Sequence, residues 1–152
     1  MASTVTASTA TITISENIVL NGVSYGNSIA KTFESQGEVI QRIMSIGTAF
    51  TEIFNATTLD GRGQVVVNDW AYFRITNLDD TNFLTLRLYD STDSQFFKIE
   101  AGESFFLMSP EIDIDASGTT FNAFSDVNEI GAIADTAQCD VEVLMITAPF
   151  SS

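Results

Sequence analysis

The chain has 152 residues, of which 45% are hydrophobic, a net charge of −14, and no histidine. This size fits one domain of about 100–150 residues, and the apolar content argues against global disorder. The missing histidine excludes Ser-His-Asp and Cys-His catalysis and histidine–metal ligation. Because 6 basic residues face 20 acidic ones, binding to nucleic acid or to an anionic membrane is not expected. Two interpretations of the acidity remain, solubility in a salty medium and complementarity to a basic partner.

The first ten residues are almost entirely Ser, Thr and Ala, and they predict an extended N-terminal arm (residues 1–10). Within it Ser3, Thr4, Val5 and Thr6 are the candidate partner-binding residues, because their β-branched content suits strand addition to a neighbouring molecule. A frayed tail is the alternative. Neither a secretory leader nor an apolar stretch long enough to span a membrane is visible, so no export signal and no membrane segment are expected.

Strand patterns follow the arm. Thr11–Leu20 alternates apolar and polar residues and predicts a strand, and Asn21-Gly22 is the strongest hairpin-turn signal in the chain. Val23–Phe33 predicts a weaker returning strand, which Gly26 interrupts. The apolar residues of Gly37–Asn55 fit either a helix or strands. The enrichment in β-branched and aromatic residues there favours two strands.

The central stretch contains four alternating apolar runs, separated by turns rich in Asn, Asp, Ser and Gly. Their succession predicts an antiparallel meander. Alternation places the three leucines of the second run on a core face and two arginines outward or beside carboxylates. The runs are Trp70–Thr76, Phe83–Tyr89, Phe96–Ile99 and Ser104–Met108, the leucines are Leu84, Leu86 and Leu88, and the arginines are Arg74 and Arg87.

The C-terminal third predicts a weakly structured segment, Asn128–Asp135, and a last strand, Cys139–Thr147. Cys139 is expected to be a small buried apolar side chain, with a reactive or interchain thiol as the alternative. In all, about nine to eleven strands with turns between them predict an all-β fold, a jelly-roll-like antiparallel β-sandwich. The sandwich is expected to be a single domain over residues 11–148, followed by a C-terminal tail of residues 149–152.

One acidic segment is a candidate calcium site. Asp113, Asp115 and Ser117, followed by Gly118, resemble the first half of an EF-hand loop, in which oxygen ligands alternate before a sharp turn. The closing carboxylate is absent, since Phe124 stands in its place. An acidic hairpin loop is the alternative, and no other cofactor is expected.

Two further groups of side chains have a functional and a structural interpretation. The pairs Asp79-Asp80 and Asp90…Asp93 could bind a metal or a sugar, but Asp also forms Asx-turns at loop tips. Alternation puts Trp70 and Tyr72 on one strand face and Phe73 on the other, so they form either a stacking platform for a ligand or, as the pattern favours, aromatic core. No carboxylate pair stands out as a hydrolytic site, and no enzyme activity is expected.

Several segments, which together span most of the chain, resemble a family of small β-rich virion structural proteins of marine tailed phages, in particular cyanophages. The segments are Ile14–Gly22, Glu38–Ile43, Tyr72–Phe83, Ala101–Phe105 and Ala134–Ala137. They are turn and strand motifs without a catalytic signature. The resemblance implies a virion component that is assembled in the host cytoplasm, and an acidic surface would suit seawater.

On this basis we expect a non-enzymatic capsid decoration (cement) protein that binds and stabilises the major capsid lattice. Its expected partners are copies of itself, as a homotrimer, and the major capsid protein. The alternatives are a tail, neck or fibre component, and a host-surface glycan-binding module that uses Trp70 and Tyr72 or the acidic loops.

Overall fold

The structure is a computed structural model, and it describes residues 6, 8–56, 70–112 and 124–147. Contacts divide the chain into two compact units, residues 1–38 with 148–152 and residues 39–147. The regular elements of the described ranges are all β-strands. This part of the chain contains no helix long and apolar enough to cross a membrane.

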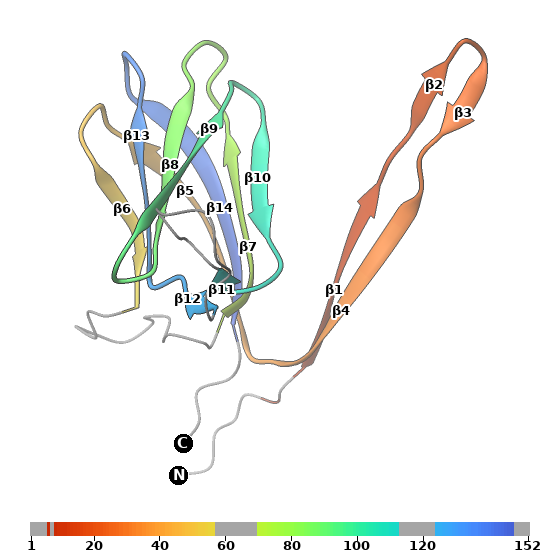
Figure 1. Cartoon of the computed structure of the whole chain (residues 1–152), viewed down its shortest axis with the longest axis horizontal. Coiled ribbons are helices and arrows are strands. Elements are labelled where there is room, and N and C mark those ends of the chain that lie inside the picture. Colours follow the sequence, from red (N-terminus) through yellow and green to blue (C-terminus); the bar gives the residue numbers. More distant parts are fainter. Residues whose placement is uncertain (1–5, 7, 57–69, 113–123, 148–152) are drawn as a thin grey trace. The chain divides into compact units, whose positions relative to one another are not determined.

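The first unit contains a long two-stranded ribbon, Ser8–Gln36, in which β1 pairs with β4 and β2 pairs with β3 (Figure 1). One antiparallel register continues from the Ala10–Phe33 pair to the Leu20–Val23 pair at the tip. The four strands are β1 (Ser8–Ser15), β2 (Ile18–Leu20), β3 (Val23–Tyr25) and β4 (Ser28–Gln36). The predicted boundary at residue 10 therefore falls inside β1, because Ser8 and Ala10 already pair with the returning strand.

Glycines shape the ribbon at two places. Asn21 and Gly22 have φ values of 52° and 78°, which confirms the predicted tight turn. Gly26 has φ 114°, and a Cβ there would lie 2.3 Å from the backbone oxygen of Glu16. The interruption predicted at Gly26 is thus a break between β3 and β4. The ribbon remains joined across it, because the Glu16 amide donates a hydrogen bond of 2.8 Å to the Asn27 carbonyl.

The second unit is a sandwich of two four-stranded sheets, ordered β10-β7-β14-β5 and β6-β13-β8-β9 (Figure 1). Apart from the β8–β9 hairpin, successive strands of these sheets alternate between the two layers, which is the order of an eight-stranded jelly roll. The predicted fold class is confirmed. The strands are β5 (Glu38–Ile46), β6 (Thr51–Asn55), β7 (Trp70–Asn77), β8 (Leu84–Tyr89), β9 (Ser94–Ile99), β10 (Ser104–Leu107), β13 (Glu129–Ala134) and β14 (Cys139–Thr147), with a small pair β11 (Glu111–Ile112) and β12 (Ser125–Asp126).

The four central runs are strands, and the second and third pair as a hairpin, but the predicted meander of all four is wrong. β7 pairs with β10 and β14 in one sheet, whereas β8 pairs with β9 and β13 in the other. The chain crosses between the sheets after Asn77 and returns after Ile99. Alternation fixes which face of a strand is buried and leaves open which strand pairs with it.

The prediction that Asn128–Asp135 is weakly structured is also wrong. Residues Glu129–Ala134 form β13, which lies between β6 and β8. Its Gly131 and Ala132 disfavour strands locally, but the Phe50 ring takes the place of a side chain at Gly131, where a Cβ would lie 2.2 Å from it. Tertiary packing overrides the local preference. The two strands favoured for Gly37–Asn55 are confirmed as β5 and β6.

The core lies between the two sheets of the jelly roll. The predicted core leucines Leu84, Leu86 and Leu88 are buried, as is Cys139, so these predictions are confirmed. The favoured interpretation of Trp70, Tyr72 and Phe73 as aromatic core is confirmed, because all three are buried, but the prediction that Trp70 shares a face with Tyr72 is wrong. The β7–β14 register shifts so that Trp70 opposes Thr147 and Tyr72 opposes Ile146, which inserts an extra residue and turns Trp70 into the core beside Phe73.

Candidate functional site

Two of the segments that carry the resemblance, Tyr72–Phe83 and Ala101–Phe105, meet at one end of the jelly roll. Asn77, at the end of β7, is fully buried, and its Nδ2 donates to the carbonyls of Asn82, Ile99 and Glu100 at 2.8, 3.4 and 3.2 Å. Its backbone N–H donates to Glu103, and its carbonyl accepts from Gly102. One amide therefore joins the β7–β8 connection to the β9–β10 connection, the two places where the chain crosses between sheets.

The acidic turns beside this corner form Asx-turns. Oδ1 of Asp79 accepts hydrogen bonds from the amides of Thr81 and Asn82, at 2.8 and 2.6 Å. Oδ1 of Asp90 accepts in the same way from Thr92 and Asp93. These carboxylates satisfy backbone donors, as the structural interpretation of the sequence expected.

Asp79 should make the stability of the fold depend on pH in the acidic range. Its backbone donors, Asn82 first, hold the pKa of Asp79 below its ordinary value. A lowered pKa in the folded state means that the ionised carboxylate stabilises the fold at neutral pH, and that this contribution is lost as pH falls through the folded pKa. We expect Asp79→Asn to lower the melting temperature at pH 7 and to flatten its fall below about pH 4.

The control is Asp80→Asn, which removes the same charge from the neighbouring residue. The carboxylate of Asp80 accepts from the side-chain hydroxyl of Thr81, whereas that of Asp79 accepts from backbone amides. Thermal melts of the two variants and the unmodified chain from pH 3 to pH 7 make the comparison. Equal changes in both variants would show that net charge, and not the Asx-turn, is responsible.

The candidate calcium residues Asp113, Asp115 and Ser117 lie outside the described residues. The strands that flank their segment, β11 and β12, pair with each other. Within the described ranges, no three Cys, Asp or Glu side chains gather closely enough to hold a metal ion. The calcium site stays a prediction.

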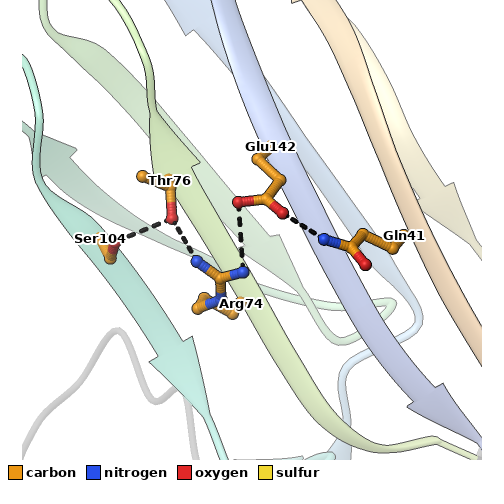
Figure 2. A network of polar contacts seen from close by, with 5 residues as sticks. All are labelled: Gln41, Arg74, Thr76, Ser104 and Glu142. Carbon is orange, nitrogen blue, oxygen red and sulfur yellow. Dashed lines mark hydrogen bonds and ion pairs between the residues drawn. The ribbon is translucent and has the colours of Figure 1, made fainter.

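The outer face of the first sheet carries a polar network that crosses all four strands (Figure 2). Arg74 on β7 pairs with Glu142 on β14 at 3.2 Å, and Glu142 accepts from Gln41 on β5. On the other side Arg74 donates to Thr76, whose hydroxyl contacts that of Ser104 on β10 at 2.8 Å. The pairing predicted for Arg74 is confirmed. Such contacts help to fix the register, and a partly exposed ion pair adds little stability.

The outer face of the second sheet carries aromatic rings around Arg87. Its guanidinium carbon lies 4.3 Å from the Phe50 ring centroid and 5.5 Å from that of Tyr89, and it pairs with Glu129. Phe96 stands opposite Arg87 on β9 and is largely exposed. Gly131 leaves the space that Phe50 occupies. By contrast Trp70 is buried, with its Nε1 hydrogen-bonded to the Val127 carbonyl, so it cannot be a stacking platform.

The largest exposed apolar surface of the first unit is on the ribbon. Alternation and the continuous register put most of its aliphatic and aromatic residues on one side, here called the apolar face, and Ser and Thr, together with Val19 and Ala30, on the other. On the opposite side hydroxyl pairs such as Thr11–Thr32 and Ser15–Ser28 lie across from each other. The most exposed residues of the apolar face are Ile18 (55%), Leu20 (60%), Val23 (53%), Tyr25 (53%) and Ile29 (62%).

This ribbon is unusual because it has no third strand among the described elements. A two-stranded hairpin is at best marginally stable in water, and an amphipathic one normally packs its apolar face on something else. The sequence showed the two strands and their turn, but it could not show that they pair only with each other. Of the predicted partner-binding residues, Thr6 is exposed and precedes β1, and Ser3, Thr4 and Val5 lie outside the described residues.

Comparison with known proteins adds no assignment: no protein-family model matches the chain, and neither a curated protein nor a solved structure matches it.

Proposed function

We propose that this protein is a non-enzymatic structural component of a phage virion, a capsid decoration (cement) protein that binds and stabilises the major capsid lattice. The observation that carries the proposal is the exposed apolar face of the ribbon, a surface built for assembly. The turn and strand motifs that resemble cyanophage virion proteins support a phage virion as the assembly. The jelly roll is a fold that capsid proteins use, which supports the proposal by analogy alone.

The energetics favour a ribbon that is covered in use. Fully burying one large aliphatic side chain contributes about 1.5–3 kcal/mol. Since Ile18, Leu20 and Ile29 are each more than half exposed, covering each of them would contribute roughly 1 kcal/mol. The gain from the whole apolar face would then be comparable with the lower end of the association cost, about 4 kcal/mol. In this proposal the partners are copies of the chain and the major capsid protein, with no cofactor.

Shortening the ribbon tests the proposal. A variant in which residues 17–26 are replaced by Asn-Gly keeps the hydrogen-bonded Glu16–Asn27 pair and closes the ribbon there, leaving the jelly-roll residues untouched. We expect its occupancy on purified phage particles to fall at least about tenfold, because four of the five most exposed residues of the apolar face are removed. A second variant lacking residues 2–10 tests the predicted N-terminal arm in the same assay.

The matched control is Val19→Ser, which removes an exposed aliphatic residue from the Ser/Thr side of the ribbon. Its occupancy should be unchanged. Undiminished occupancy of the shortened variant would contradict the proposal. Copies per particle then separate the alternatives: hundreds indicate head decoration, and about six to twelve indicate a tail or neck component.

A further inference from the structure

The ribbon is nearly free of charge in a strongly acidic protein. Between Ser8 and Gln36 the charged residues are Glu16, Lys31 and Glu34, a net charge of −1, so the other residues of the chain carry −13 of the total of −14. Two copies that met through other surfaces would bring like charges together. The ribbon is the surface on which a second copy can dock with the least repulsion.

The charges of the ribbon are also placed in a self-complementary way. Alternation puts Lys31 and Glu16 on the apolar face, while Glu34 lies on the Ser/Thr side, where it accepts a hydrogen bond from Thr9. Lys31 stands opposite Ile12, and Glu16 stands opposite Asn27. The Ile14–Ile29 pair lies midway between these two levels.

This spacing selects one arrangement of two ribbons. Consider two ribbons that face each other across a two-fold axis, which lies between them at the level of the Ile14–Ile29 pair. The axis reverses the direction of one ribbon relative to the other, and it brings Lys31 of each copy to the level of Glu16 of the other. A three-fold bundle of parallel ribbons would instead gather three Glu16 at one level and three Lys31 at another. Like charges at one level disfavour the bundle, and opposite charges favour the antiparallel pair.

We propose that the apolar face of the ribbon binds the same face of a second copy of this chain, antiparallel and centred on the Ile14–Ile29 pair. The contact covers the exposed Ile18, Tyr25 and Ile29 of both copies. It is a two-fold contact, in place of the homotrimer expected from the sequence. The inference rests on the ribbon being the assembly surface of the proposed function, and it holds whether or not the assembly is a virion.

Charge exchange tests the orientation. Sedimentation equilibrium of the purified chain should show a dimer, and Glu16→Lys or Lys31→Glu alone should weaken it about tenfold, because each creates two like-charged contacts. The double variant Glu16→Lys/Lys31→Glu restores both pairs at the original net charge, and its dimer should return to within about twofold. A double variant no better than either single one would overturn the antiparallel arrangement.

A second pair of variants tests the face. Ile29→Asp buries two charges at the proposed axis and should abolish the dimer. Ala30→Asp adds the same charge at the next residue, on the Ser/Thr side, and should leave the dimer intact. Equal effects of both variants, or a monomeric unmodified chain at about 100 μM, would overturn the second copy as the partner.

The dimerisation and particle-binding measurements can fail independently, so they test this inference and the proposed function separately. A chain that dimerises through the ribbon but does not bind phage particles would refute the virion role and leave the dimer standing. A chain that stays monomeric in solution and still binds particles through the ribbon would refute the dimer and leave the virion role standing.

Discussion

Asn77→Asp is expected to destabilise the jelly roll by about 3 kcal/mol or more, and so to lower its melting temperature by about 10 °C. Asn77 is fully buried, and its Nδ2 is the donor for the Asn82, Ile99 and Glu100 carbonyls. Aspartate keeps the shape but loses this donor, and it places carboxylate oxygens against three carbonyl oxygens. The Asn82, Ile99 and Glu100 carbonyls then lose the side-chain donor that they share.

Two comparisons make this result specific. Asn77→Ala removes the donor without adding a charge and should destabilise the fold less than Asn77→Asp. Asn27→Asp is the matched control, because the exposed Asn27 acts as an acceptor for the Ser28 amide, which aspartate preserves. Chemical denaturation monitored by tryptophan fluorescence measures all three. An Asn77→Asp variant as stable as Asn27→Asp would refute the structural role of the corner.

Leu86→Ala is expected to lower the free energy of unfolding by about 2–5 kcal/mol. Leu86 lies at the middle of β8 and is fully buried in the cluster between the two sheets. Removing its side-chain carbons loses their burial and leaves a cavity, because β8 is held between β9 and β13 and can relax only partly.

Thr85→Ala is the control for this substitution. Thr85 is the adjacent residue on β8 and faces the outer side of the sheet, where its pairing partners are Ile133 and Lys98. Its replacement should change stability by less than about 1 kcal/mol. Urea denaturation of both variants provides the measurement. Similar losses in the two would mean that the faces of β8 are assigned incorrectly.

The candidate interaction surface was only half predictable. Asn21-Gly22 and the flanking alternation indicated a hairpin, and the structure has that turn in a continuous register. Nothing local in Thr11–Phe33 distinguishes a hairpin inside a sheet from a ribbon without a third strand. That difference depends on which other strands have unpaired edges nearby, which is a property of the whole chain.

The aromatic cluster around Arg87 was missed for a related reason. Phe50, Tyr89 and Gly131 belong to three different segments of the chain, and the register of β13 with β6 and β8 brings them to Arg87. The one local trace is a glycine within an otherwise apolar segment. A strand glycine marks the close approach of another group, and here that group is the Phe50 ring.

The sequence by itself determined the β class, the faces of Leu84–Leu88 and the tight turn at Asn21-Gly22. These follow from side-chain alternation and from backbone preferences, which act over a few residues. Only the tertiary structure decided that β7 pairs with β10 rather than β8, and that Gly131 lies in a central strand. Strand pairing is chosen by burying both sheets on a common core and by satisfying buried groups such as Asn77, and these conditions join residues far apart in the chain.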